Sequence, residues 1–455
     1  MAGRRQPRGI MNPEFRRLLW LEATPQRLWL IPVALLGATL VLDRAIPAAI
    51  PAAALLAFAA LTIVWGARQA RAAVIDEVRA HTWDIQRMSA LSAWPMTWGK
   101  LAGATLMPWY AGFVCLGVHA AYRGERDLEE VAGASLVLIL AALVAQAVAL
   151  TTALVGVHRE RGQRTRLGTP LVLLLLALVV PTTFGLAMPE GAAAAPAAIN
   201  WYGWQVSTMP FLLVLLALLA GWAVLGAYRS MCIELQIRTT PWAWLGFALF
   251  LALLVAGLAP PPAPAALAGL GSTTALYATL LAYVAGFAFA RDPVQYRRVL
   301  QALAEGRVRR ALEELPLWLS SVLFALGFAL AAALFGSDPA ISNERPDNLG
   351  VVALAVVVMA VRDLALLTWL SFRDGSRRAE LVTLVSIAML NRVIPATLAF
   401  VGLDGVAGLV HPPLFDAPLT ACAILLVHVV VACMLASAAW RRAMPVLNSP
   451  GDRRS

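Results

Sequence analysis

The chain has 455 residues, of which 60% are apolar and only 14% are charged, and its formal net charge is +10. A water-soluble domain carries about 25% charged residues, so the composition excludes a soluble globular protein. The remaining apolar surface requires a bilayer, where only helices or closed barrels satisfy the backbone. The apolar runs are long and do not alternate with polar residues, which favours helices.

A spanning helix needs about 20 mostly apolar residues. Twelve segments approach or exceed that length, near residues 28–42, 46–66, 99–121, 133–157, 170–188, 209–228, 241–259, 265–289, 316–335, 350–371, 381–401 and 418–439. They predict an all-α integral membrane protein with about 12 transmembrane helices.

Basic residues are distributed unevenly between the connections. Of the 36 basic residues, 30 fall in the two termini and the even-numbered connections. This positive-inside pattern predicts that both termini are cytoplasmic. It also argues against a nucleic-acid partner, since basic loops beside a membrane meet anionic lipid headgroups. Lys100 is the sole lysine, which is typical of a GC-rich genome and indicates a bacterial inner (plasma) membrane protein.

The second half of the chain repeats features of the first at an offset of about 213 residues. Arg161–Pro181 and Arg373–Pro395 each end an arginine-rich loop and enter an apolar segment that closes on proline. We therefore predict two domains, 1–238 and 239–455, each with six helices. An even number of spans makes them parallel repeats about an axis along the membrane normal. The alternative is that arginine-rich loops before apolar helices look alike without duplication.

Each half carries a charged stretch between its second and third apolar segments. In the first half, apolar and charged residues alternate at three- and four-residue steps near 71–94, as in an amphipathic helix. The stretch near 291–315 is its counterpart. We expect each to form a helix on the cytoplasmic membrane surface with a charged face toward the cytosol. The plainer interpretation is a surface helix that only anchors the third span.

The segment HTWDIQRMSALSAWPMTWGKL, together with the acidic residue before it, resembles the loop of type 2 ABC transporter permeases. The family pattern falls on Glu77, Thr82, Ser92, Pro95, Gly99 and Lys100. His81 stands where the family has glycine, and the second half lacks the Gly-Lys pair, as in a diverged copy. The resemblance covers Met11 to about Arg238.

This resemblance implies that the surface helices couple to a separate ABC-type ATPase, expected as a dimer that binds ATP and magnesium. The chain would be the permease of an exporter that works by alternating access on an unidentified substrate, with both six-helix units fused. The candidate coupling residues are Glu77, Thr82, Trp83, Asp84, Arg87, Gly99 and Lys100 in the first half, and Arg297, Arg298 and Arg310 in the second.

Motifs for intrinsic chemistry are missing from the sequence. Gly99-Lys100 is followed by Leu101 and has no upstream glycine at P-loop spacing. There is no His-Glu-x-x-His, Gly-x-Ser-x-Gly or Cys-x-x-Cys pattern. We therefore predict no catalytic residue, metal site or cofactor in this chain, and no enzyme activity of its own.

Five polar residues lie inside predicted spans: Gln146, Arg362, Asp363, Asn391 and Arg392. Buried charges of this kind usually face the bundle interior and mark a substrate path or a coupling site. The structural alternative is a pair of Asp363 with Arg392 that locks two helices, because adjacent Arg362 and Asp363 point to different faces of a helix. Gln146 is expected to make an interhelical hydrogen bond.

Two other functions fit parts of the sequence. An ion-coupled secondary transporter also has twelve spans in two sets of six, and Arg362, Asp363 and Arg392 would be its coupling charges. Against it, the Gly-x-x-x-Asp-Arg-x-Gly-Arg loop of the large facilitator class is missing. A membrane enzyme acting on lipid-linked sugars is the third candidate, but it needs clustered carboxylates or histidines at the membrane edge.

Overall fold

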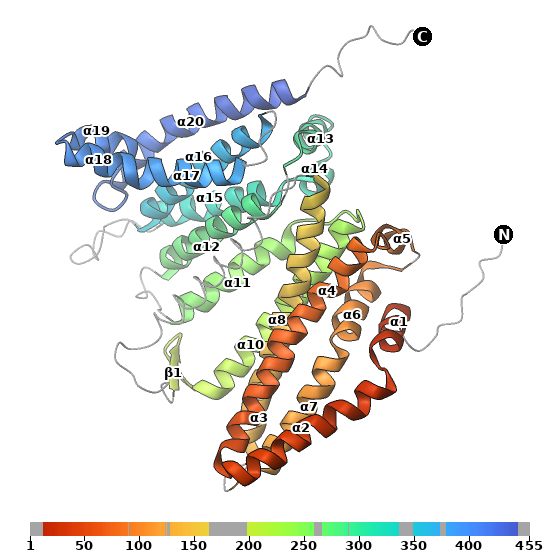
Figure 1. The fold of residues 1–455 in the computed structure, drawn as a ribbon. Helices are drawn as coiled ribbons and strands as arrows, with labels where there is room; N and C mark the ends of the chain where they lie inside the picture. The colour runs from red at the N-terminus through yellow and green to blue at the C-terminus, as the bar shows by residue number, and fades with distance from the viewer. Residues whose placement is uncertain are drawn as a thin grey trace, which may run out of the picture. The chain divides into compact units, whose positions relative to one another are not determined.

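The computed structural model is an all-α protein with one small β-hairpin (Figure 1). It describes residues 12–89, 91–122, 124, 128–162, 198–258, 266–289, 291–335, 349–373 and 379–444. The chain divides into two compact units: unit 1 comprises Met1–His158 and Ser207–Thr239, and unit 2 comprises Arg159–Val206 and Thr240–Ser455.

Unit 1 begins with a short helix, α1, that is followed by the apolar helices. Its elements are α1 (Pro13–Glu22), α2 (Pro25–Ala45), η1 (Pro47–Ala49), α3 (Ile50–Ala59), the π-helical η2 (Ala60–Trp65), α4 (Gly66–Arg79), α5 (Trp83–Arg87), α6 (Ala93–Ala104), α7 (Leu106–Ala121), α8 (Leu128–Gly162) and α10 (Thr208–Glu234).

Unit 2 begins with the hairpin of β1 (Ala198–Trp201) and β2 (Trp204–Ser207), which bonds to α11. The strand β2 ends at the border between the units. The helices are α11 (Trp242–Leu258), α12 (Ala266–Ala288), α13 (Pro293–Ala304), α14 (Val308–Glu314), α15 (Leu317–Phe335), α16 (Leu349–Phe372), α17 (Ala379–Ala388), the π-helical η5 (Met389–Val393), α18 (Ile394–Phe400), α19 (Asp404–Val410) and α20 (Pro418–Ala443).

Among the described residues, nine helices are long and apolar enough to cross a membrane. They coincide with nine of the twelve predicted spans. The predicted span 99–121 is a pair, α6 and α7, bent by 50° at Thr105, and 241–259 is the shorter apolar helix α11. The span 170–188 lies outside the described residues. The protein is therefore an all-α multi-pass membrane protein by length and composition.

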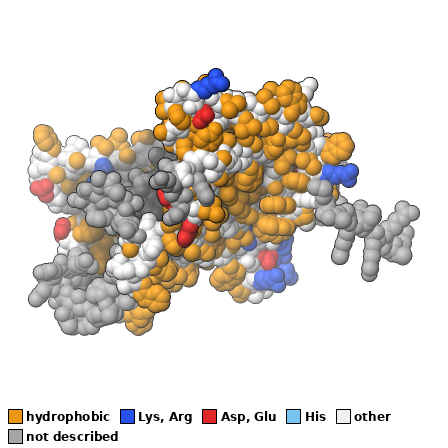
Figure 2. Space-filling model, turned by 90° about the horizontal axis from the view of Figure 1, so that it is seen from below, with side chains coloured by type: hydrophobic (Ala, Val, Ile, Leu, Met, Phe, Trp, Pro, Cys, Tyr) orange, Lys and Arg blue, Asp and Glu red, His pale blue; other side chains and the backbone are white. Residues whose placement is uncertain are grey.

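Hydrophobic side chains cover much of the described surface (Figure 2). Exposed leucine, valine and phenylalanine residues occur on almost every long helix, and the candidate span Pro25–Ala45 has none of its apolar window buried. In water this surface would drive aggregation. In a membrane the same side chains contact lipid tails, which explains why the helices are apolar on their outer faces.

The predicted surface helices are each divided in two, contrary to the expectation of one helix per stretch. In unit 1, α4 continues the second span as far as Arg79, and the chain then turns at His81, whose φ is +56°. Only Trp83–Arg87 forms a separate short helix. In unit 2, a turn at Gly306, with φ +69°, separates α13 from α14. A residue in the left-handed region cannot continue an α-helix, so both predictions of one unbroken helix are wrong.

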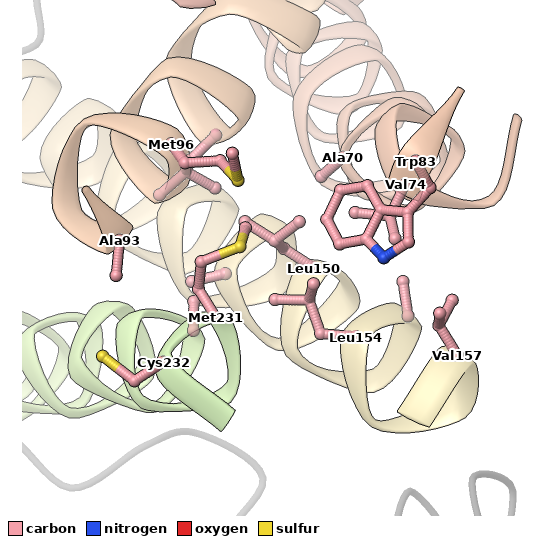
Figure 3. Close-up of a cluster of buried hydrophobic side chains, with 14 residues drawn as sticks. Ala70, Val74, Trp83, Ala93, Met96, Leu150, Leu154, Val157, Met231 and Cys232 are labelled. Atoms are coloured by element: carbon pink, nitrogen blue, oxygen red, sulfur yellow. The ribbon is translucent and has the colours of Figure 1, made fainter. Parts of the chain in front are cut away.

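A buried cluster below the surface segment of unit 1 joins five helices (Figure 3). Trp83 of α5 packs with Val74 of α4 and with Leu154 and Val157 of α8, while Met231 contributes from α10. Trp83 is only 1% exposed. Burying a side chain of this size fixes α5 against the ends of the spanning helices.

Candidate functional site

The centre of the candidate site is the Lys100 side chain, which is 0% exposed. Its Nζ lies 3.0 Å from Glu14 Oε1, donates a hydrogen bond to Glu77 Oε2, and also bonds Gln86 Oε1 at 3.1 Å and the Ala73 carbonyl at 3.3 Å. These partners come from α1, α4 and α5. One ammonium group therefore ties three elements to the beginning of the α6–α7 pair.

Two glycines allow α1 to approach α6. A Cβ on Gly99 would lie 2.7 Å from the Glu14 Cβ, and one on Gly103 would lie 2.8 Å from the Leu18 Cβ. The two glycines are four residues apart and so share one helix face, the small-residue spacing that permits close helix packing in membranes.

Asn12 is the N-cap of α1, because its side chain accepts a hydrogen bond from the Glu14 N–H. Its Nδ2 donates to the Pro95 carbonyl at 2.6 Å, which adds a second connection between α1 and α6.

The charges of this cluster balance. Lys100 and Arg17 contribute two positive charges, and Glu14 and Glu77 contribute two negative ones, with Arg17 bonded to both carboxylates. Burial raises the pKa of Glu14, but the hydrogen bond from Arg17 and the nearby Lys100 outweigh it and hold that pKa below 4.5. The hydrogen bond with Glu14, against the opposing effect of burial, raises the pKa of Arg17. Both shifts favour the charged forms of Glu14 and Arg17.

The short helix α5 is held from a second side by the end of α10. Trp83 Nε1 donates to Glu234 Oε2 at 3.3 Å, and Arg87 Nε donates to the Glu234 carbonyl at 2.8 Å. The Lys100 Nζ lies 5.2 Å from the centre of the Trp83 ring, within the range of a cation–π interaction. Thr82 Oγ1 donates to the Glu77 carbonyl at 3.2 Å across the turn.

The opposite face of α5 is open to solvent. Ile85 is 67% exposed and Met88 is 80% exposed, and the Asp84 side chain, which pairs with Arg87 at 3.3 Å, is 71% exposed. Two apolar side chains and a carboxylate on a firmly held helix form a small raised surface, which we name the α5 face. Such a surface suits contact with another protein, because apolar anchors there are not buried by this chain.

The structure brings all seven first-half coupling candidates into one network, with Asp84 at its exposed edge, where its Oδ1 accepts from Arg87 Nη1 at 3.3 Å. The candidates of the second half are arranged differently. Arg298 lies 3.9 Å from Glu314, and both Arg298 and Arg310 are exposed, while Arg297 is half-buried. They belong to unit 2. Their role in coupling stays a prediction.

The polar residues inside the spans also have defined neighbours. In unit 1, Gln146 of α8 accepts from Trp109 Nε1 and donates to the Thr62 carbonyl, both at 2.9 Å. These are the interhelical hydrogen bonds predicted for Gln146. Thr62 lies in the π-helical turn η2, where the irregular backbone leaves a carbonyl available.

In unit 2, Arg362 and Asp363 pair with each other. Arg362 Nε donates to Asp363 Oδ1 at 2.9 Å, and Tyr283 of α12 donates to Asp363 Oδ2 at 2.8 Å. Arg362 Nη2 donates to Asn391 Oδ1 at 2.6 Å. The predicted pair of Asp363 with Arg392 is therefore wrong. The long arginine stem lets the guanidinium fold back onto its neighbour even though the two Cβ atoms point to different helix faces.

Sequence reasoning missed several members of these networks, namely Glu14, Arg17, Gln86, Glu234 and Tyr283. One signal was present for Glu14. It is the single acidic residue in an otherwise basic N-terminal segment, and it follows Asn12-Pro13, a helix-start pattern. The described part of the chain holds no group of three or more histidine, cysteine or carboxylate side chains placed to bind a metal.

Comparisons with protein families, with curated proteins and with solved structures gave no match to this chain. The contacts described above therefore carry the functional argument by themselves.

Proposed function

We propose that this chain is the membrane-spanning permease of an ABC exporter, working by alternating access with a separate ATPase. The observation that carries the proposal is the anchoring of the α5 face. A cytosolic motor can move spanning helices only through a surface that is exposed to the motor and rigidly connected to those helices. The α5 face meets both requirements in unit 1.

The contacts of α5 define the route of such a movement. Trp83 is buried among α4, α8 and α10, and Gln86 bonds the same Lys100 ammonium that bonds Glu14 and Glu77. A displacement of α5 would strain these bonds unless α1, α4 and α6 moved with it. We infer that ATP-driven closure of the partner, expected as a dimer carrying ATP and magnesium, acts first on this group of helices.

Corresponding contacts in the two units support fused six-helix halves. In unit 1 the mid-span residue Gln146 bonds the helix that precedes the surface segment, and in unit 2 Asp363 does the same through Tyr283 of α12. The end of α10 bonds the surface segment through Glu234, and the end of α20 does so through Trp440, whose Nε1 donates to the Pro293 carbonyl at 3.0 Å. Corresponding contacts at corresponding positions of the two units are the expected result of an internal duplication.

The proposal includes the location expected from the charge pattern. Arginines cluster at the surface segments and at the end of α20, where Arg441 and Arg442 occupy the last turn. With these regions in the cytoplasm, both termini are cytoplasmic, and the host membrane is a bacterial inner membrane. Lipids are then the immediate neighbours of the exposed apolar faces.

A secondary transporter remains the second candidate, and the Arg362–Asp363 pair favours it. Paired charges buried in a spanning helix are used as ion-coupling sites. Here, however, Asp363 is already bonded by Arg362 and Tyr283. A coupling ion would have to displace one of them. The two candidates differ in energy source, since the secondary transporter works on an ion gradient with no ATPase present.

The α5 face provides the test. The tagged chain is purified from its host in mild detergent, and co-purifying proteins are identified by mass spectrometry and assayed for ATP hydrolysis. We expect a Walker-type ATPase with the wild type and its loss with Met88→Arg, whose side chain is exposed, and with Asp84→Arg, which also removes the 3.3 Å pair with Arg87. Glu77 is unsuitable for this test because it is bonded to buried Lys100.

Asp404→Arg is the matched control, since it reverses one exposed carboxylate on α19, which is expected on the other side of the membrane. It should retain the ATPase. Equal loss of the ATPase from all three variants, or transport at full rate by the purified chain under an ion gradient alone, would refute the permease proposal.

A further inference from the structure

The residue Arg392 occupies an unusual position in unit 2. It lies on the π-helical turn η5, within the candidate span Ala379–Phe400, and its side chain is exposed. At 1.5 Å per residue it is about 20 Å from Ala379 and about 12 Å from Phe400 along the helix. A charge at this depth costs a few kcal/mol on insertion scales unless it meets a partner.

The neighbours of Arg392 do not neutralise it. The charge of Arg362 is matched by Asp363, which is also bonded to Tyr283. Within the described ranges, Arg392 forms no hydrogen bond or salt bridge. The site therefore has an excess of one positive charge on the exposed side of the span.

His411, in the loop before α20, is influenced by the charge of Arg392. Its Nδ1 is buried, and the described residues offer it no hydrogen-bond partner. Burial lowers the pKa of His411, and so do the charges of Arg362 and Arg392, while the charge of Asp363 opposes them.

Apolar side chains surround Arg392 on the same helix. Val385, Met389 and Val393 are all exposed, and Ala396, four residues after Arg392, is exposed as well. The span has only 6% of its apolar window buried. Any molecule that reaches Arg392 from this side must therefore bring an apolar surface together with its negative group.

We propose that Arg392 binds the phosphate headgroup of an anionic lipid that lies against α17, η5 and α18. A guanidinium group binds phosphate oxygens bidentately. The acyl chains would cover Val385 and Met389. Lipid is favoured over a soluble anion because the surrounding face is apolar, and over a protein carboxylate because lipid is the medium of an exposed span. This site does not depend on coupling to an ATPase.

The test uses the full-length protein in detergent micelles. Binding of dioleoylphosphatidylglycerol and of dioleoylphosphatidylcholine is measured by native mass spectrometry for wild type, Arg392→Gln and Arg441→Gln. Arg441 is exposed at the end of α20, so its loss removes the same charge from another place. We expect a preference for phosphatidylglycerol that falls about tenfold in Arg392→Gln, which corresponds to about 1.4 kcal/mol, and is retained in Arg441→Gln.

Arg392→Lys keeps a point charge without the planar fork, and an intermediate preference would support the bidentate contact. Size-exclusion chromatography of each variant detects misfolding and any self-association of the chain. Four outcomes would overturn the proposal: no headgroup preference in the wild type, equal loss in Arg441→Gln, displacement of the lipid by inorganic phosphate, or self-association of the wild type that Arg392→Gln abolishes while lipid binding is unchanged.

Discussion

The surface segments of the two units fill the same place in the chain but are held by different forces. In unit 1, α5 is fixed by buried charges around Lys100. In unit 2, α13 and α14 are fixed by neutral bonds: Trp318 Nε1 donates to the Tyr296 hydroxyl at 3.0 Å, and Gln295 Nε2 donates to the Glu314 carbonyl at 2.9 Å. The pairs Arg298–Glu314 and Arg309–Glu313 of this segment each have an exposed arginine. The buried pair of unit 2, Arg362–Asp363, lies in the spanning helix α16.

This difference has an energetic consequence. Exposed ion pairs contribute about 0–1 kcal/mol each, whereas removing one partner of a buried pair costs about 3–5 kcal/mol. We therefore expect the segment of unit 1 to be more sensitive to single charge changes than the segment of unit 2. If only one of the two surface segments transmits the movement of an ATPase to the spanning helices, we expect it to be the segment of unit 1.

The largest expected effect comes from Lys100→Met. It leaves Glu14 and Glu77 in a buried place with Arg17 as their remaining cation, so we expect a loss of about 3–5 kcal/mol. The measurement is the thermal unfolding of the purified protein in detergent, followed by intrinsic fluorescence. Arg298→Met is the matched control in unit 2, where the arginine side chain is 56% exposed and 3.9 Å from Glu314, so we expect a change of about 0–1 kcal/mol.

Equal unfolding temperatures for Lys100→Met and Arg298→Met would contradict the comparison. A second variant separates charge from packing. Adding Glu14→Gln to Lys100→Met removes one uncompensated carboxylate, and it should recover part of the lost stability. Additive losses in the double variant would mean that Glu14 and Lys100 do not interact.

A smaller effect is expected from Gly99→Ala. In a helix interior this change ordinarily stabilises by about 0.5–1 kcal/mol. Here the new Cβ would lie 2.7 Å from the Glu14 Cβ and 3.0 Å from the Phe15 backbone nitrogen. Overpacking of this kind costs about 1–3 kcal/mol, so the net result should be destabilisation.

Gly117→Ala in α7 is the control for this change, because nothing lies within 4 Å of its added Cβ. It should be neutral or stabilising in the same thermal measurement. A stabilising Gly99→Ala would show that α1 does not rest on α6 at this point.

The sequence predicted the described spans because a long apolar run has few alternatives in a bilayer. It did not predict how the surface segments break, since the apolar spacing continues past His81 and Gly306, and only the backbone reveals their positive φ. The partners of Lys100 were beyond reach for another reason. Glu14 is 86 residues away and Glu77 is 23 residues away, and no local pattern links them.

The pair of Arg362 with Asp363 illustrates a third limit. Sequence reasoning placed the two side chains by the directions of their Cβ atoms, which suits short side chains. Arginine has a long flexible stem, and its guanidinium can reach a neighbour that its Cβ faces away from. Tyr283, which completes the environment of Asp363, lies 80 residues away on α12. Such long-range contacts can be identified only from the packed structure.

The smallest expected effect is the acid response of Glu14. Because the bonds to Arg17 and Lys100 hold its folded pKa below the ordinary value of 4.5, ionised Glu14 stabilises the folded state. This contribution is fully present above pH 4.5 and is lost as the pH falls through the lower, folded pKa. Glu14→Gln lacks it at every pH. The gap in unfolding temperature between wild type and Glu14→Gln should therefore be constant above about pH 4.5 and narrow below it.

Glu305→Gln, which removes an exposed carboxylate paired with Arg307, is the control for this prediction and should leave a small and constant gap in unfolding temperature from wild type. A Glu14 gap that stays unchanged as the solution is acidified would mean that the buried charges do not hold the unit 1 segment.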